Sequence, residues 1–196
     1  MPRTTTDAVP HGRLSALDQP VLDAGACVLR PWRASDAAAV VAAFDDPDIH
    51  RWHACSVTAD EAPAWIAQWA VRWAEETDTS WALAMGDEPV GQIGLRGLNH
   101  ADGHTGVSYW VMPAARRRGL ASAALSVLAH WSFDVLGVHR IAIDHSTENP
   151  ASCAVATKAG FRSEGTKRGD ALHADGWHDM HVHARLATDG PAERLS

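Results

Sequence analysis

The feature that most constrains this chain is a basic turn at residues 116–121, Arg-Arg-Arg-Gly-Leu-Ala. Residues 107–111 before it have the β-branched and aromatic composition of a strand, and Pro113 ends that strand. Residues 120–135 after it carry apolar side chains at helical spacing, as far as Gly137, a common residue just beyond a helix. The turn therefore joins the end of a strand to the start of a helix.

This turn predicts a binding site for a diphosphate. Gly119 has no Cβ to hold a ligand away from the backbone, so the free N–H groups of the first helical turn can point at phosphate oxygens. The helix dipole and the arginines add positive potential. The predicted cradle comprises Arg116, Arg117, Arg118, Gly119, Leu120, Ala121 and Ser122. The alternative is an ordinary surface turn with a basic run.

Three segments, in a fixed order, resemble the GNAT superfamily of N-acetyltransferases. The Arg-x-x-Gly-x-Ala pattern of residues 116–121 is similar to the family's acetyl-CoA loop. Residues 149–165, with Asn-x-x-Ser, Lys-x-Gly-Phe and Glu-Gly, resemble the branch that contains the ribosomal-protein N-terminal acetyltransferases. Residues 29–36, Leu-Arg-Pro-Trp followed by Ser-Asp, are similar to that branch's first strand and helix start. The resemblance covers about Cys27 to Leu186.

The resemblance implies a single α/β domain with a twisted mixed β-sheet, helices on both faces and the cofactor where two neighbouring strands diverge. We expect a loose N-terminal arm over residues 1–21, the acetyltransferase domain over 22–187 and a flexible C-terminal tail over 188–196. Helices are predicted at 35–44, from a Thr58/Glu61 capping box onward, at 120–136 and at 151–159. Strands are predicted at 80–85, 90–96, 107–111, 138–144, from 161 and at 180–186.

Composition restricts the functional classes. A length of 196 residues with 46% hydrophobic content suits one globular domain. The net charge of −7 argues against nucleic-acid binding. No membrane partner is expected, because no apolar run reaches membrane-spanning length and the start lacks a secretory signal, so a cytoplasmic location is predicted. The three cysteines are widely spaced, which predicts reduced thiols. A monomer or a homodimer is equally compatible.

The chemistry that the resemblance implies is attack of an amine on the thioester of acetyl-CoA. In the family, a backbone N–H at the end of the strand before the cradle polarises the carbonyl, and Trp110, Val111 and Met112 occupy that stretch. Ser152 matches the position that assists the leaving thiolate, and Asn149 matches the one that holds the pantetheine arm. The alternative is structural, since Asn-Pro followed by Ser also marks a turn and a helix start.

The usual candidate base is missing. The branch carries an acidic residue three positions before its Tyr-Trp pair, where this chain has Gly106. His104 lies on the same side of the predicted strand and could accept a proton through water, with Asp102 and His145 as further candidates. The alternative for His104 is a polar residue beside a turn.

The acceptor pocket is expected near Trp52 and His53, in the loop between the first two helices, because that region lines the pocket in the family. A primary amine is implied as the acceptor. The α-amine of a protein, peptide or small molecule is favoured because its pKa near 7.7 to 8.0 leaves more of it neutral than a lysine side chain. An antibiotic or polyamine is the alternative acceptor, and a CoA-binding module without catalysis is the alternative class.

Twelve histidines raise the question of a metal. His181 and His183 share a face of the predicted final strand, and His178 or His173 could approach them. No carboxylate or thiolate stands at a recognisable ligand spacing. We therefore expect no metal, and ordinary surface histidines on an edge strand.

Overall fold

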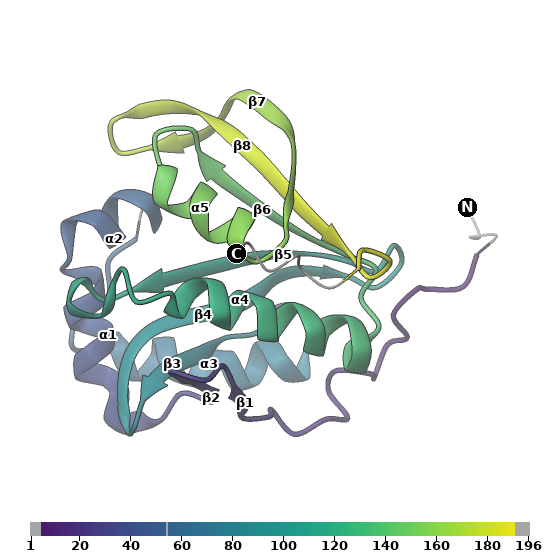
Figure 1. Ribbon diagram of the computed structural model, residues 1–196. Helices are drawn as coiled ribbons and strands as arrows, with labels where there is room; N and C mark the ends of the chain where they lie inside the picture. Colours follow the sequence, from purple (N-terminus) through teal and green to yellow (C-terminus); the bar gives the residue numbers. More distant parts are fainter. Residues whose placement is uncertain (1–4, 54, 191–196) are drawn as a thin grey trace.

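The structure is a computed structural model that describes residues 5–53 and 55–190. Its centre is one eight-stranded sheet with the order β1-β2-β3-β4-β5-β6-β8-β7 (Figure 1). Neighbouring strands are antiparallel except for β5 and β6, which are parallel. The strands are β1 Leu22–Asp23, β2 Val28–Arg30, β3 Trp81–Met85, β4 Glu88–Asn99, β5 His104–Val111, β6 Arg140–Ser146, β7 Arg162–His173 and β8 Gly176–Leu186. The predicted α/β class with a mixed sheet is confirmed.

Helices cover both faces of the sheet, as predicted. In Figure 1, α4 crosses in front of β4, with α5 on the same side, and α3 lies behind the sheet. The helices are α1 Ala37–Phe44, α2 Pro47–His53, α3 Ala62–Ala74, α4 Leu120–Trp131 and α5 Pro150–Lys158. The apolar side of α4 is buried in the main core, whereas α1 and α3 enclose Trp110 in a second cluster. Trp110 therefore faces the side of the sheet covered by α1 and α3, and the residues of β5 next to it face the main core under α4.

The helix α2 was not predicted, because Asp45-Asp46-Pro47 is also a pattern that ends a helix. Proline fits the first turn of a helix, where its missing N–H is not needed. The Asp46 carboxylate accepts a hydrogen bond from the Ile49 N–H at 3.0 Å, as an N-terminal cap does. The same three residues thus end one helix and begin the next.

The tryptophans of α3 belong to the core. Trp69 and Trp73 are buried, and Trp65 packs edge-on against Trp32 with ring centroids 5.2 Å apart. The Glu61 carboxylate accepts a hydrogen bond from the Thr58 N–H at 2.9 Å, one half of the predicted capping box.

The N-terminal segment differs from the expected loose arm over residues 1–21. Val9 and Leu14 are buried in the main core. The Glu76 carboxylate, just beyond α3, accepts hydrogen bonds from the Leu14 and Gly12 N–H groups at 2.6 and 2.7 Å. Polar composition without periodicity misled the prediction, because a buried carboxylate and scattered hydrogen bonds attach this segment instead of a regular strand ladder. Residues 191–196 of the expected tail lie outside the described part of the chain.

The last strand, β8, lies between β6 and β7 rather than at the sheet edge that the sequence suggested. Cys27, Cys55 and Cys153 are free thiols. Among the described residues, no helix combines the length and the hydropathy needed to cross a bilayer.

Candidate active site

The parallel strands β5 and β6 separate shortly after they meet. Their pairing is confined to residues 104–106 with 140–142. Beyond Gly106 a cavity of about 160 Å³ opens between them. Residues that line it include Trp52, His53, Tyr109, His145, Asn149 and Ser152. The divergence therefore brings together residues that the sequence had placed in four separate segments.

A hydrogen bond between Tyr109 and Ser152 spans this cavity. The Tyr109 hydroxyl lies 2.7 Å from Ser152 Oγ, and either oxygen can be the donor. Burial raises the pKa of Tyr109 to about 12, against the opposing effect of the Ser152 hydrogen bond. From the sequence, Tyr109 was predicted only to be part of a strand. Its alternation with the buried Trp110 was the available signal that it points to the opposite face.

The amides at the end of β5 point in alternate directions. The Met112 N–H donates to the Val90 carbonyl at 2.8 Å. Because antiparallel pairing with β4 alternates along the strand, the amides of Trp110 and Met112 face β4 and that of Val111 faces the open edge. Of the three residues predicted to polarise the thioester, Val111 is therefore the one that offers its N–H to the gap.

The predicted cradle has the backbone of a glycine turn. Gly119 adopts φ 76° immediately before α4, and Arg117 adopts φ 59°. A Cβ on Gly119 would have only one neighbour within 4 Å, Lys158 Nζ at 3.8 Å. Arg117 and Arg118 are exposed. The Lys158 ammonium, from the end of α5, is a further basic group at this loop to which the sequence analysis assigned no role.

Arg116 behaves differently from the two arginines that follow it. Its guanidinium forms ion pairs of 2.7 Å with both Asp46 and Asp48, and its Nε donates to the Val111 carbonyl at 2.9 Å. The side chain is thus bound to the start of α2 and to the end of β5. It connects the cradle to the segment that carries Trp52 and His53.

Asn149 and Ser152 lie at the start of a helix, which was the alternative, structural interpretation of these residues. Asn149 Oδ1 accepts a hydrogen bond from the Ser152 N–H at 3.1 Å and caps α5. The cap fixes Ser152 one turn into the helix, where its hydroxyl faces Tyr109. The amide nitrogen of Asn149 is not used in this cap, so capping and ligand binding are compatible.

Trp52 and His53 line the cavity, but from the helix α2 rather than from a loop. His53 Nε2 lies 3.2 Å from the Tyr109 carbonyl. Burial lowers the pKa of His53, an effect that the hydrogen bond to Tyr109 opposes and the nearby Arg96 guanidinium reinforces. Its imidazole is therefore held in the neutral form near pH 7.

His104 does not join this group. It stands where β5 still pairs with β6, and it lines a separate hollow of about 220 Å³ together with Gly106 and Arg140. Asp102 accepts a hydrogen bond from the Asn99 side chain at 3.0 Å in the preceding turn. Of the three candidate bases, His145 alone lines the cavity at Ser152. His104, the preferred candidate base, therefore lies outside the cavity that contains Ser152.

A family model described as an acetyltransferase (GNAT) domain matches residues 27–162. The chain belongs to the GNAT acetyltransferase family. Relatives of this GNAT chain include the uncharacterised N-acetyltransferase YoaA of Bacillus subtilis, 28% identical over 76% of this chain and 86% of its own length. The ribosomal-protein-serine acetyltransferase of Escherichia coli is 27% identical over 51% of this chain and 56% of its own.

Solved structures agree with this assignment. Mycobacterium smegmatis RimJ, in complex with CoA-disulfide, is 25% identical, with a TM-score of 0.78 over 89% of this chain and 90% of its own. The resemblance inferred from the three sequence segments is confirmed. The protein is an acetyl-CoA-dependent N-acetyltransferase of the GNAT family.

Proposed function

We propose that this acetyltransferase modifies free α-amines of proteins or peptides, with acetyl-CoA held between β5 and β6. The observation that carries the proposal is the Tyr109–Ser152 hydrogen bond of 2.7 Å at the point where these strands diverge. The hydroxyl groups of this pair donate a proton to the leaving CoA thiolate, while the Val111 N–H stabilises the oxyanion of the tetrahedral intermediate. The diphosphate binds the amides of the turn at Gly119, with Arg117, Arg118 and Lys158 around it.

His53 is our proposed proton acceptor. The Tyr109 carbonyl can only accept a hydrogen bond, so His53 Nε2 carries the proton and Nδ1 keeps its lone pair. Because burial lowers its pKa, the ring is available as a base at neutral pH. It takes a proton from the attacking amine directly or through one water.

Two arguments support an α-amine as the acceptor. An α-amine is partly neutral near pH 8, and a single imidazole is sufficient help, whereas a lysine side chain requires a stronger base. In addition, a relative from Escherichia coli carries the name ribosomal-protein-serine acetyltransferase.

The acceptor class is tested with two matched peptides at pH 7.5, using release of free CoA thiol as the readout. One peptide has a free N-terminus and no lysine; the other is Nα-blocked and contains one lysine. We expect faster turnover of the first. Faster turnover of the blocked, lysine-bearing peptide would reject the α-amine proposal.

The base is tested with His53→Gln and His104→Gln as a matched pair. The pH profile of kcat/KM should have an acidic limb whose apparent pKa lies below the ordinary histidine value of 6.5, because the pKa of His53 is lowered. That limb should disappear in His53→Gln and persist in His104→Gln. The reverse pattern would return the role to His104.

A further inference from the structure

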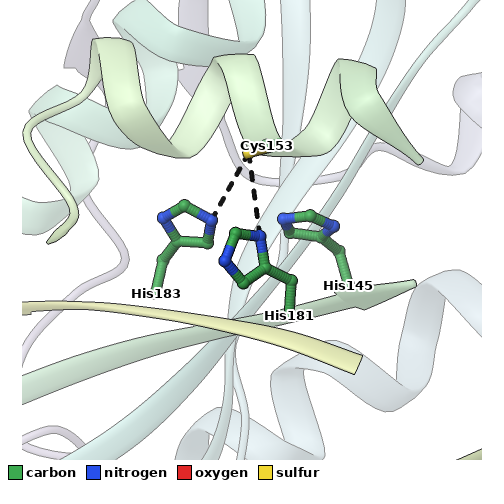
Figure 2. Close-up of side chains that lie close together, drawn as sticks. All are labelled: His145, Cys153, His181 and His183. Carbon is green, nitrogen blue, oxygen red and sulfur yellow. Dashed lines mark hydrogen bonds between the residues drawn. The ribbon is translucent and has the colours of Figure 1, made fainter. Parts of the chain in front are cut away.

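Three histidines and a cysteine meet between α5 and the sheet (Figure 2). The antiparallel register of β6 and β8 sets His145 directly opposite His181, and His183 lies two residues further along the same face. Cys153 is a residue of α5, and its thiol faces these histidines. The His181–His183 pair is visible in the sequence, whereas the thiol and the third imidazole come close to it only in the folded chain.

The distances are close to those of tetrahedral coordination. Cys153 Sγ lies 3.6 Å from His183 Nε2 and 3.8 Å from His181 Nδ1, and one ligand atom from each of the four residues lies within 4.8 Å of the others. Zinc bonds of about 2.3 Å to sulfur and about 2.1 Å to nitrogen place tetrahedral S and N ligands roughly 3.6 Å apart. Small side-chain rotations close the remaining separations.

The hydrogen bonds around the cluster orient lone pairs toward its centre. His145 Nδ1 lies 2.8 Å from the Ser146 carbonyl, which can only accept, so Nε2 keeps its lone pair. That Nε2 is buried and has no hydrogen-bond partner among the described residues. His181 Nε2 contacts Ser163 Oγ at 2.8 Å, which leaves its Nδ1 facing Cys153. Outer contacts of this kind orient imidazoles that bind metals.

In the other two clusters of histidines and carboxylates among the described residues, the buried histidines have both ring nitrogens engaged. His100 contacts the Val9 and Glu76 carbonyls with its two ring nitrogens, at 3.1 and 3.3 Å. His178 contacts Ser146 Oγ at 2.7 Å and the Asp175 carboxylate at 2.9 Å. Their nitrogens are already engaged, so their proximity to carboxylates is explained without an ion.

We propose that Cys153, His145, His181 and His183 bind one Zn²⁺ ion. A thiolate and three neutral imidazoles are all zinc ligands, and together they complete a closed tetrahedral set of four. Binding converts the Cys153 thiol to the thiolate and releases one proton to solvent. The ion ties α5, which contains Ser152 and is capped by Asn149, to β6 and β8. This site is independent of the identity of the acetyl acceptor.

The first test titrates Zn²⁺ into the full chain, without a histidine tag and after removal of metal by a chelator. Calorimetry should give one ion per chain, and the thermal midpoint should rise with Zn²⁺. Cys153→Ser should weaken Zn²⁺ binding at least tenfold, and so should His181→Asn. The exposed Cys55 and His50 provide matched controls, so Cys55→Ser and His50→Gln should bind as the unchanged protein does.

The second test uses Co²⁺ as a spectroscopic substitute. A cobalt–thiolate charge-transfer band should appear in the unchanged protein and in Cys55→Ser, and be absent from Cys153→Ser. Circular dichroism checks that each variant is folded. Zn²⁺ affinity unaffected by both Cys153→Ser and His181→Asn, or no thiolate band in the unchanged protein, would overturn the proposal.

Discussion

Gly119 is the residue on which the cofactor loop depends. It has φ 76° and almost no neighbour at its missing Cβ, so the space beside it is open to a ligand. Gly137, at φ 83° beyond α4, has the same backbone geometry with nothing within 4 Å of an added Cβ. The two glycines therefore have similar backbone conformations and open surroundings, and they differ in that only Gly119 lies at the predicted diphosphate site.

We expect Gly119→Ala to weaken CoA binding about tenfold, or about 1.4 kcal/mol, because the methyl group intrudes on the diphosphate. Gly137→Ala should leave CoA binding unchanged. Both should destabilise the fold by a similar amount, about 1–2 kcal/mol, since both force an alanine into the left-handed region. Calorimetry with CoA and thermal unfolding provide the two readouts. Equal effects of the two substitutions on CoA binding would contradict the cradle.

Tyr109 and Ser152 should act on turnover rather than on binding. We expect Tyr109→Phe and Ser152→Ala each to lower kcat on the order of tenfold to a thousandfold, with a smaller change in the KM for acetyl-CoA. Because the pKa of Tyr109 is raised to about 12, the phenol stays protonated at ordinary assay pH and Tyr109→Phe should leave the shape of the pH profile unchanged. Steady-state kinetics checks both points. A loss confined to KM would make the pair a binding feature.

At this scale, local sequence patterns indicate candidate residues within motifs, whereas contacts that depend on the path of the chain cannot be read from the sequence. Gly119 and Ser152 follow from local patterns. The partner of Ser152 is Tyr109, 43 residues earlier, and no local pattern connects them. His104 was proposed as the base because strand alternation can be read from sequence, whereas the end of the β5–β6 pairing cannot, and His53 was predicted only to line the acceptor pocket.

At the scale of elements, the site depends on the short helix α2. It spans Pro47–His53 and carries two residues of the cavity wall. Arg116 holds its first turn through Asp46 and Asp48. The same arginine bonds to the end of β5, so one side chain sets the position of α2 relative to the cofactor loop.

We expect Arg116→Gln to raise the KM for the amine acceptor more than the KM for acetyl-CoA, because its ion pairs position α2 rather than face the diphosphate. Arg118→Gln is the matched control, since Arg118 is exposed at the same loop, and it should raise the KM for acetyl-CoA instead. Kinetics with each substrate varied in turn separates the two effects. If Arg116→Gln weakens chiefly acetyl-CoA, the phosphate role predicted from sequence stands.

The elements that sequence predicted best are those with a clear period. β8 alternates apolar residues with His181, His183 and Arg185, and its strand was predicted from residue 180 onward. The place of β8 in the sheet was not predicted, because pairing order depends on long-range contacts. Because β8 was expected at the edge of the sheet, His183 was expected to be exposed, whereas it is buried beneath α5.

At the scale of the whole molecule, the N-terminal segment is part of the domain. It has no regular secondary structure to reveal this, and its attachment comes from Val9, Leu14 and the Glu76 carboxylate. Three backbone N–H groups, of Gly12, Leu14 and Ser15, donate to that carboxylate. Truncation at residue 21, which the sequence suggested as the domain boundary, would leave a buried carboxylate without these partners.

Glu76 should make stability depend on pH. Its burial would raise the pKa, but the hydrogen bonds from the Ser15, Gly12 and Leu14 amides outweigh burial and lower it in the folded state. The carboxylate therefore stabilises the fold fully above the unfolded value near 4.5, and this stabilisation is lost as pH falls through the lowered folded value. Glu76→Gln should destabilise the protein by about 1–3 kcal/mol at pH 7.

The difference between Glu76→Gln and the unchanged protein should shrink as the pH is lowered below 4.5, because both then lack the charge. Denaturant unfolding at several pH values measures it. Glu75→Gln, at the exposed neighbouring position, is the matched control and should stay within about 0.5 kcal/mol of the unchanged protein throughout. A Glu76→Gln effect as small as that of Glu75→Gln would mean that contacts other than the Glu76 hydrogen bonds, such as the burial of Val9 and Leu14, hold the N-terminal segment.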